Sequence, residues 1–259
     1  MNTRYPHGLK IDHLTEYTDY PVHMERMNWI ISTIMRERGK GTVKILDVGC
    51  GTGNITIPLG MIPNSEVVGI DMYQPNIDLV NQRNTLPNVK VQFSRLGDFD
   101  VSDFDYIIFT EVLEHIPGYG EILDDLSKRM KSSAKILVTI PNGWGPFEWA
   151  MTPLYFMRRI GLNGFIGRVK KWLGKKEPYA LNQEIDPHVN FFTQRRIRRD
   201  CVRYGLKLES FERAFIFSPI LETYTPFISL QNIAPRDNKL AQWLPASLSS
   251  GWYYQMGKA

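Results

Sequence analysis

The sequence predicts an α/β protein with a doubly wound, largely parallel sheet. Short apolar segments alternate with segments of helical periodicity between Pro21 and Ile140. The first of these apolar segments, residues 43–48, lacks the alternation of a half-exposed strand, as expected of a strand that helices cover on both faces. Acids, glycine or asparagine stand where these strands end, and ligands bind at that edge of such sheets.

The order of elements follows from the same patterns. Strands are expected at residues 43–48, 66–71, 89–93, 104–109 and 135–140, and then, after a break in the pattern, at 206–213 and 251–256. Helices are expected at residues 21–38, 54–61, 76–84, 120–131 and 193–204. The first begins at Pro21, which suits the first turn of a helix.

The chain of 259 residues is expected to form one domain, residues 1–259. Within it we expect an N-terminal lid segment at 1–22, a helical insert at 143–187 after the fifth strand, and a long connection at 214–250. With 43% hydrophobic and 22% charged residues, the composition is that of a globular protein rather than a disordered one.

Cysteine use and the N-terminal residues bear on location. The two cysteines, Cys50 and Cys201, are too few for a disulfide framework, which favours a reducing compartment. The first residues lack the apolar core of a secretory signal, and no run approaches the ~18 apolar residues of a membrane span. We therefore expect a cytoplasmic protein. The net charge of +4 does not by itself indicate nucleic-acid binding.

The first expected strand runs into a loop with glycine at every second position, DVGCGTGN, which begins at Asp47. Glycine allows positive φ and removes the Cβ atoms that would hold a ligand away from the backbone. The N–H groups of the helix expected next would point at the same place. The following strand ends at Asp71, whose carboxylate can accept both hydroxyls of a ribose. Met72 beside it can pack on an adenine face.

The spacing of the glycines separates two classes of ligand. Dinucleotides use G-x-G-x-x-G, with the pyrophosphate on the helix N-terminus. Here the spacing is G-x-G-x-G, and an aspartate precedes it on the strand. That pattern fits a ligand without a pyrophosphate and disfavours a dinucleotide oxidoreductase.

Four segments, ILDVGCGTGN, VVGIDMY, FDYIIFTEVLEHI and KILVTIPN, resemble the main motifs of class I S-adenosylmethionine-dependent methyltransferases. The resemblance covers residues 40–142 closely and extends more loosely through HVNFFTQRRI and GWYYQMGK. It implies a Rossmann-like sheet of seven strands in the order 3-2-1-4-5-7-6, with the last strand antiparallel. It also implies S-adenosyl-L-methionine as the cofactor and methyl transfer as the reaction.

The same resemblance implies how the cofactor is held. Asp47 and the glycine loop would hold its methionine end and Asp71 its ribose, while residues 96–99 would lie near the adenine. Asp98 would there either accept from the adenine amino group or cap a turn. The expected cofactor-binding residues are Asp47, Gly49, Cys50, Gly51, Gly53, Asn54, Asp71, Met72, Asp98 and Glu111.

A second group of polar residues follows the fourth expected strand. Glu111, Glu114 and His115 stand at i, i+3 and i+4, so they share one face if residues 111–116 form a helical turn. His188 lies in DPHVNFFT, just before an expected helix. We expect these four residues to form the catalytic group, with a histidine as the base because its ordinary pKa lies near working pH.

Three roles for this group stay open. The E-x-x-E-H motif with a later histidine is similar to that of ubiquinone-biosynthesis O-methyltransferases and of small-RNA 3′-end 2′-O-methyltransferases, where such residues are associated with a divalent metal. The resemblance thus implies a Mg²⁺ or Mn²⁺ site formed by Glu111, Glu114, His115 and His188, which would lower the pKa of an acceptor hydroxyl. Otherwise His115 or His188 acts as the base directly, or the group only shapes the pocket and contacts the cofactor.

Residues 154–176 carry seven lysines and arginines, no acid, and interleaved aromatics. Three interpretations stay open: a lid with a solvated basic face, contact with an anionic membrane surface, or binding of a phosphate-bearing substrate such as RNA. Ubiquinone-type enzymes carry a membrane-contacting insertion in a comparable place, so the resemblance supports the second. No recognisable RNA module is appended.

Together these patterns predict an S-adenosyl-L-methionine-dependent methyltransferase that acts on an oxygen of a small-molecule, glycan or lipid-linked acceptor. We expect it in the cytoplasm or peripherally at the inner face of a membrane. RNA 2′-O-methylation with a divalent metal and a non-catalytic cofactor-binding protein are the alternatives. The resemblance of E-V-L-E-H, I-P-N and H-x-x-x-F-T to small-metabolite and surface-polysaccharide enzymes favours a small acceptor over nucleic acid.

Overall fold

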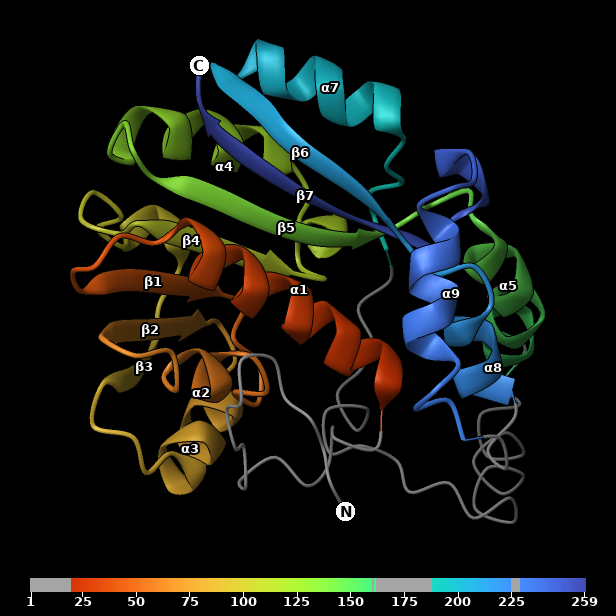
Figure 1. Cartoon of the computed structure of the whole chain (residues 1–259), viewed down its shortest axis with the longest axis horizontal. Coiled ribbons are helices and arrows are strands. Elements are labelled where there is room, and N and C mark those ends of the chain that lie inside the picture. The colour runs from red at the N-terminus through yellow and green to blue at the C-terminus, as the bar shows by residue number, and fades with distance from the viewer. Residues whose placement is uncertain (1–19, 160, 162–187, 225–228) are drawn as a thin grey trace.

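A computed structural model describes residues 20–159, 161, 188–224 and 229–259. A seven-stranded sheet runs through the described chain, with helices on both of its faces (Figure 1). The strands are β1 (Val43–Val48), β2 (Ser65–Asp71), β3 (Val89–Phe93), β4 (Tyr106–Thr110), β5 (Lys135–Pro141), β6 (Leu206–Ala214) and β7 (Gly251–Lys258). Their order is β3-β2-β1-β4-β5-β7-β6, and β7 is antiparallel to both of its neighbours. The expected fold class and strand order are confirmed.

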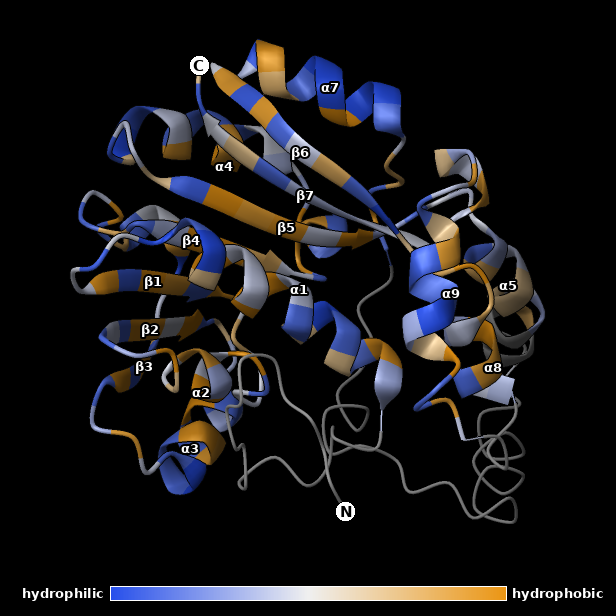
Figure 2. Cartoon of the chain, in the orientation of Figure 1, coloured by the Kyte–Doolittle hydropathy of each residue, from blue (hydrophilic) through white to orange (hydrophobic). Residues whose placement is uncertain are grey.

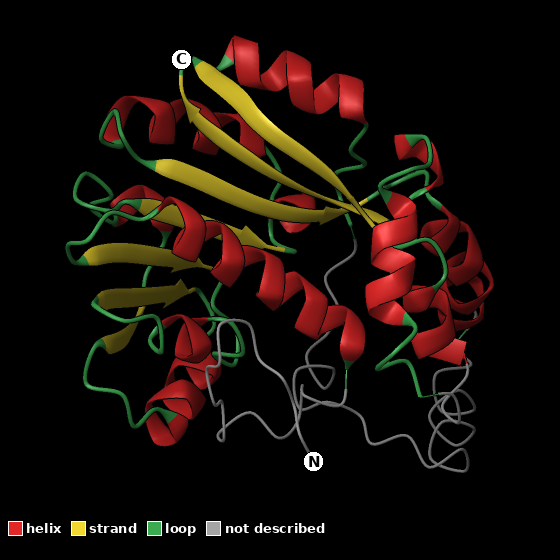
Figure 3. Cartoon of the chain, in the orientation of Figure 1, coloured by secondary structure: helices red, strands yellow, loops and turns green. Residues whose placement is uncertain are grey.

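The helices differ in length and place. They are α1 (Pro21–Glu37), α2 (Thr56–Leu59), α3 (Gln74–Arg83), α4 (Tyr119–Arg129), α5 (Pro146–Arg159), α7 (Gln194–Arg203), α8 (Ser218–Tyr224) and α9 (Ala234–Ala241). Short 3₁₀ turns occur at Leu96–Asp98, Leu113–His115 and Ala246–Leu248. Figure 3 shows α5, α8 and α9 grouped together beyond the carboxyl end of β5.

Both faces of β1, β4 and β5 are buried, which explains their largely apolar sequences, whereas the edge strand β3 is exposed at Lys90, Gln92 and Phe93. In β1, Ile45 belongs to the apolar cluster that α1 covers, and Leu46 belongs to the cluster on the opposite face. Ile30 of α1 packs in the first cluster, and Leu126 of α4 packs in the second. Figure 2 shows the hydrophobic residues concentrated along β5, in the middle of these layers.

Most element boundaries differ from expectation by one or two residues, and two of the differences lie near the site. The helix expected at residues 54–61 is only Thr56–Leu59, because the side chain of Asn54 donates to Thr52 Oγ1 at 2.6 Å and holds the preceding residues in turns. The strand expected at 104–109 is Tyr106–Thr110. Asp105, just before it, accepts the backbone N–H of Lys44 with its side chain at 2.8 Å, and its own backbone N–H donates to Lys44 O at 2.8 Å.

Several expected features lie partly or wholly outside the described residues. Of the N-terminal lid segment at 1–22, only residues 20–22 are described, and the last two begin α1. Of the basic segment at 154–176, residues 154–159 belong to α5 and residue 161 is described; the remainder falls outside. The connection at 214–250 contains α8 and α9, which the sequence did not predict. No helix in the described ranges is long and apolar enough to cross a membrane.

Candidate active site

The glycine loop leaves β1 at the carboxyl edge of the sheet, beside the end of β2. Gly49, Gly51 and Gly53 all have positive φ, of 70°, 51° and 82°. The backbone N–H groups of Gly49 and Cys50 both donate to Ile70 O, at 2.8 and 3.0 Å, and so fasten the loop to β2. A Cβ at Gly49 would lie 2.7 Å from Val112 Cγ2, so only glycine lets the loop contact the turn after β4.

Asp71 ends β2 directly opposite this loop. Its Oδ2 accepts the backbone N–H of Gly51 and its Oδ1 that of Tyr73, both at 2.8 Å. Each carboxylate oxygen keeps a second lone pair, and the side chain is partly exposed. A Cβ at Gly51 would meet no atom within 4 Å, so the loop is open there. These residues fit a ligand that donates two hydroxyl groups to Asp71.

Asp47 lies beneath the loop rather than on its surface. Its side chain is 2% exposed and accepts Thr56 Oγ1 at 2.6 Å, which ties β1 to α2. Burial raises the pKa of Asp47 from 3.8 to about 7, and the charge of Asp71 adds to this shift. Cys50 is also buried, and burial raises the pKa of its thiol, so it stays uncharged.

The other expected cofactor residues lie at different depths. Asn54 is buried beside Thr52. Met72 has 60% of its side chain exposed and can cover a flat ligand face. Asp98 is exposed at the end of the 3₁₀ turn Leu96–Asp98, and its backbone N–H donates to Arg95 O.

Glu111 does not share a helical face with Glu114 and His115, contrary to expectation. Its φ is +53°, in the left-handed region, so the chain reverses there and the 3₁₀ turn begins only at Leu113. The Glu111 side chain forms an ion pair with Arg26 of α1 at 3.2 Å and accepts Thr139 Oγ1 at 3.1 Å. Its side chain therefore contacts α1 and β5, while its charge still acts on Glu114 and His188.

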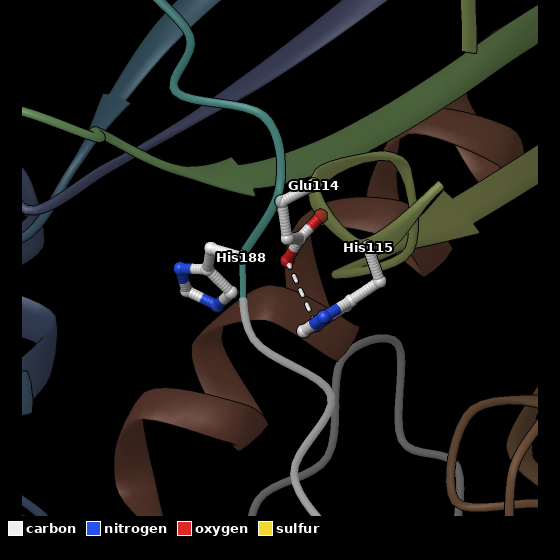
Figure 4. A group of neighbouring side chains, drawn as sticks. All are labelled: Glu114, His115 and His188. Carbon is white, nitrogen blue, oxygen red and sulfur yellow. Dashed lines mark ion pairs between the residues drawn. The ribbon is translucent and has the colours of Figure 1, made fainter. Parts of the chain in front are cut away.

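The structure instead brings Glu114, His115 and His188 together (Figure 4). One ligand atom from each of them lies within 4.8 Å of the others. The His115 and His188 rings meet edge to face with centroids 4.9 Å apart, and His115 Nε2 is 3.9 Å from Glu114 Oε1. Glu114 is only 1% exposed, and no hydrogen bond from a described residue reaches either of its carboxylate oxygens.

Charge in this group is set by burial and by neighbouring acids. Burial raises the pKa of Glu114 well above its ordinary value, and the charge of Glu111 raises it further, although Arg26 opposes this. Burial lowers the pKa of His188, but contact with Glu148 and its charge outweigh this effect, so the net direction is upward. Both shifts favour the protonated forms of Glu114 and His188, and perturbed groups of this kind cluster at functional sites.

The residues around His188 are fastened to the turn after β4. The backbone N–H groups of Val189 and Asn190 donate to Glu114 O at 2.9 and 3.0 Å. The Asn190 amide also donates to Leu113 O and Ile116 O, at 3.0 and 2.7 Å. Segments more than 70 residues apart in the chain thus meet at one point.

Three residues of this site were missed by the sequence analysis: Arg26, Glu148 and Asn190. Arg26 contacts Glu111, and Glu148 Oε1 lies 3.3 Å from His188 Nδ1. Arg26 lies in α1, and the apolar spacing of that helix is explained by core packing, so nothing in the sequence marked Arg26 as a site residue. Glu148 and Asn190 lie close in the sequence to residues that had been singled out, Asn142 and His188, and this proximity was the only available signal.

The three-residue group meets the chemical requirements of a divalent metal site. It offers one carboxylate with unsatisfied oxygens and two imidazoles, a donor set that Mn²⁺ and related ions accept. Glu111, the fourth residue expected there, is not in the group. Its ion pair with Arg26 occupies its carboxylate instead.

Comparison with known proteins places the chain among methyltransferases. A family model described as "Methyltransferase domain" matches residues 24–210. The chain is 32% identical over 121 residues to the ubiquinone biosynthesis O-methyltransferase of Rickettsia bellii (strain OSU 85-389), which covers 45% of this chain and 50% of that protein. It is 28% identical over 139 residues to the mitochondrial ubiquinone biosynthesis O-methyltransferase of Mus musculus, in an alignment that covers 50% of this chain and 37% of that protein. The chain spans about half the length of the curated relatives it matches.

Solved structures resemble the fold over most of the chain. Magnesium protoporphyrin IX methyltransferase from Synechocystis PCC 6803, with bound SAH, aligns with a TM-score of 0.57 at 12% identity, covering 98% of this chain and 90% of that one. Geranyl diphosphate C-methyltransferase from Streptomyces coelicolor A3(2), in complex with Mg²⁺, geranyl diphosphate and S-adenosyl-L-homocysteine, aligns with a TM-score of 0.56 at 12% identity, covering 96% and 90%. With the family match over residues 24–210 and a sheet in the order 3-2-1-4-5-7-6, the chain belongs to the class I S-adenosylmethionine-dependent methyltransferases.

Proposed function

We propose that this chain transfers the methyl group of S-adenosyl-L-methionine to a hydroxyl oxygen of a small-molecule acceptor. The observation that carries the proposal is the position of Glu114, His115 and His188 next to the glycine loop. Gly49 of the loop contacts Val112, and Val112 immediately precedes the turn that holds Glu114 and His115. A donor on the loop and an acceptor at the histidines would then be neighbours.

The reaction needs alignment and a base. S-adenosyl-L-methionine supplies a methyl group on a sulfonium, and its sulfur keeps the electron pair of the broken bond when the acceptor oxygen bonds to the methyl carbon. The proton of the acceptor hydroxyl passes to a ring nitrogen of His115 or His188. Where His115 is the base, Glu114 would face the imidazolium that forms, because its carboxyl group lies 3.9 Å from His115 Nε2.

The cofactor would be held by the residues at the ends of β1 and β2. Asp71 would accept from the ribose hydroxyls, and the open backbone at Gly51 would let the ligand approach. Met72 would cover the adenine. Arg26, whose guanidinium is largely buried beside Glu111, would present positive charge to a carboxylate of the methionine end.

A divalent metal, Mg²⁺ or Mn²⁺, is a second route that the same residues support in place of a histidine base, because an imidazole bound to a metal does not accept the acceptor proton. Glu114, His115 and His188 would hold it, and it would lower the pKa of the acceptor hydroxyl. The matched relatives named as ubiquinone biosynthesis O-methyltransferases support an O-linked acceptor, and lipid-linked or glycan acceptors remain within the proposal. RNA 2′-O-methylation with a metal is the alternative that the same three residues support.

Peripheral contact with a membrane is a further part of the proposal. Trp149 and Phe156 of α5 and Trp144 before it leave most of their side chains exposed, and α5 leads directly into the basic residues of 158–176. Exposed aromatics followed by bases suit an anionic lipid surface. A cytoplasmic protein acting at the inner face of a membrane is consistent with this combination.

A methyl-transfer assay with labelled S-adenosyl-L-methionine tests the proposal. Candidate acceptors are catechols, polyprenylated phenols, glycans and RNA, each measured with and without a chelator. Transfer to a hydroxylated small molecule that is lost in His115→Gln supports the proposal. Loss of transfer in the presence of the chelator would show that the three residues act through a metal. Transfer to RNA alone supports the alternative. Binding of S-adenosylhomocysteine without transfer to any acceptor class would leave the chain a cofactor-binding protein and contradict the proposal.

A further inference from the structure

The turn after β5 carries an acidic residue that the proposed reaction has not used. The sequence there is PNGWGPFE, and its last residue, Glu148, lies in the first turn of α5. The side chain is 8% exposed. A carboxylate is seldom buried to this degree unless an opposite charge or a hydrogen-bond donor faces it.

The path of the chain explains how Glu148 reaches this place. The buried amide of Asn142 donates to Ser249 O at 2.8 Å and to Ser247 O at 3.2 Å, which fixes the start of the turn. A Cβ on Gly143 would lie 2.9 Å from Phe191 Cα, so the turn packs backbone to backbone against the segment that holds His188. α5 then begins beside His188.

Glu148 faces one particular nitrogen of that histidine. Its Oε1 lies 3.3 Å from His188 Nδ1. Figure 4 shows one ring nitrogen of His188 directed away from Glu114 and His115. Because Nδ1 faces Glu148 at this ion-pair distance, Nε2 is the nitrogen that remains for a ligand or for an acceptor proton. Carboxylates that hold the far nitrogen of a working histidine set both its tautomer and its ring orientation.

We propose that Glu148 is a positioning residue of the active site, which holds the proton of neutral His188 on Nδ1 and thereby presents an unprotonated Nε2 to the acceptor. This rests on the proposed role of His188 in methyl transfer. It adds a fourth side chain to Glu114, His115 and His188, delivered by α5. Glu148 itself does not contact the acceptor.

A simpler explanation would be that Glu148 only complements the dipole of α5, since acids favour the first turn of a helix. Glu121 in the first turn of α4 is the matched case, because it has the same helix position but lies outside the histidine group. A dipole role predicts that both glutamates affect stability and that neither affects His188. A positioning role predicts an effect of Glu148 on the His188 ring alone.

The test is the tautomer of His188 in the full-length protein, read by two-bond ¹H–¹⁵N correlation spectra of ¹⁵N-histidine-labelled samples at a pH where the ring is neutral. The His188→Gln spectrum assigns the signal among the five histidines. In the wild type we expect the proton on Nδ1. In Glu148→Ala it should move to Nε2, the form that a free imidazole prefers, and Glu121→Ala should leave the wild-type pattern unchanged.

Glu148→Leu, which keeps the volume of the side chain, repeats the experiment if the alanine variant unfolds, and binding of S-adenosylhomocysteine reports that the variants are folded. The same tautomer in wild type and in the Glu148 variants would overturn the proposal. Because the spectrum needs no acceptor, it is decided separately from the proposed reaction. Where an acceptor is found, the Glu148 variants should lose roughly 10- to 100-fold in turnover, as expected for the outer partner of a working histidine.

Discussion

The guanidinium of Arg26 lies 3.2 Å from the carboxylate of Glu111, so α1 is joined by an ion pair to the turn that follows β4. This contact holds in place a residue whose φ of +53° is unfavourable for a glutamate. It also sets one positive charge beside two acids, Glu111 and Glu114.

Replacing Arg26 should destabilise the fold more than replacing another arginine of the same helix. Arg26→Met leaves the largely buried Glu111 without its partner, so we expect a loss of about 2 kcal/mol in the free energy of unfolding. Arg36→Met, at an exposed site, should change it by less than about 0.5 kcal/mol. Urea unfolding measures both. Equal effects of the two substitutions would show that the ion pair does not stabilise the turn.

Asp71 should decide the affinity for S-adenosylhomocysteine. Asp71→Ala removes the acceptor for two hydroxyl groups and also releases Gly51 N–H, so we expect affinity to fall at least about 10- to 100-fold. Calorimetric titration measures it. Asp78→Ala, in the exposed part of α3, is the control and should bind as the wild type does. Undiminished affinity in the Asp71 variant would move the ribose site elsewhere.

Loss of His115 or Glu111 should separate turnover from binding. His115→Ala should abolish detectable methyl transfer, since general-base catalysis alone contributes roughly 10²- to 10⁴-fold. Glu111→Ala should abolish it for another reason, because Glu111 and Arg26 fix the turn that carries Glu114 and His115. Both variants should still bind S-adenosylhomocysteine, because Asp71 and the glycine loop are unchanged. The measurements are a transfer assay beside a calorimetric titration. Retained turnover in His115→Ala would remove His115 from the catalytic group, and retained turnover in Glu111→Ala would show that its ion pair does not position the turn.

Asp47 should make the ligand-free protein less stable as the pH rises. Its pKa is 3.8 ordinarily and about 7 when folded, because of burial. Between these values the folded state holds more protons than the unfolded state, so the free energy of unfolding falls from about pH 4 to about pH 7 and then levels. Asp47→Asn cannot titrate, and its fall over this window should be smaller.

Urea unfolding at a series of pH values between 4 and 8 compares the two proteins. Asp78→Asn is the control, because that side chain is exposed, and it should follow the wild-type curve. A curve for Asp47→Asn with the full wild-type slope would show that Asp47 is ionised at neutral pH despite its burial.

Asn190 should hold the His188 segment against the turn after β4. Asn190→Ala removes three hydrogen bonds, two donated to Leu113 O and Ile116 O and one accepted from Arg196 Nη2, and should cost about 1–3 kcal/mol. The amides of residues 189 and 190, which donate to Glu114 O, should exchange with deuterium faster. Asn232→Ala, at an exposed site, is the control. Unchanged exchange would mean that the backbone bonds alone hold the segment.

Much of the fold was predictable because it rests on local requirements. An apolar strand, three alternate glycines and Asp71 follow one another within 29 residues, and each constrains the backbone in a way that few other sequences satisfy. The strand order and the antiparallel last strand came from the resemblance of whole motifs, and they are confirmed. Short helices such as α8 and α9 were missed because their apolar spacing covers too few residues to show a period.

The site was predictable only in part, for a different reason. Glu114, His115 and His188 meet because Asn190 and two backbone N–H groups bind the turn that holds Glu114, which no spacing along the chain reveals. Glu111 was placed on the same face because i, i+3 and i+4 residues share one in a helix. Its positive φ turns Glu111 out of that helical arrangement. Its side chain is held instead by Arg26 and Thr139, which lie far away in the sequence.

Two asparagines fix the ends of the segment between β5 and α7. Asn142 is bound to carbonyl groups of residues 246–249, and Asn190 to those of residues 113 and 116. Anchors of this kind separate the segment that contacts the acceptor from the part of the chain that binds the methyl donor. We expect the stretch between the two asparagines to be exchangeable among related proteins without disturbing the donor loop. Acceptor preference can then diverge during evolution while the part of the chain that binds the methyl donor is kept. Chimeras joined at these two positions should exchange acceptor preference as a unit.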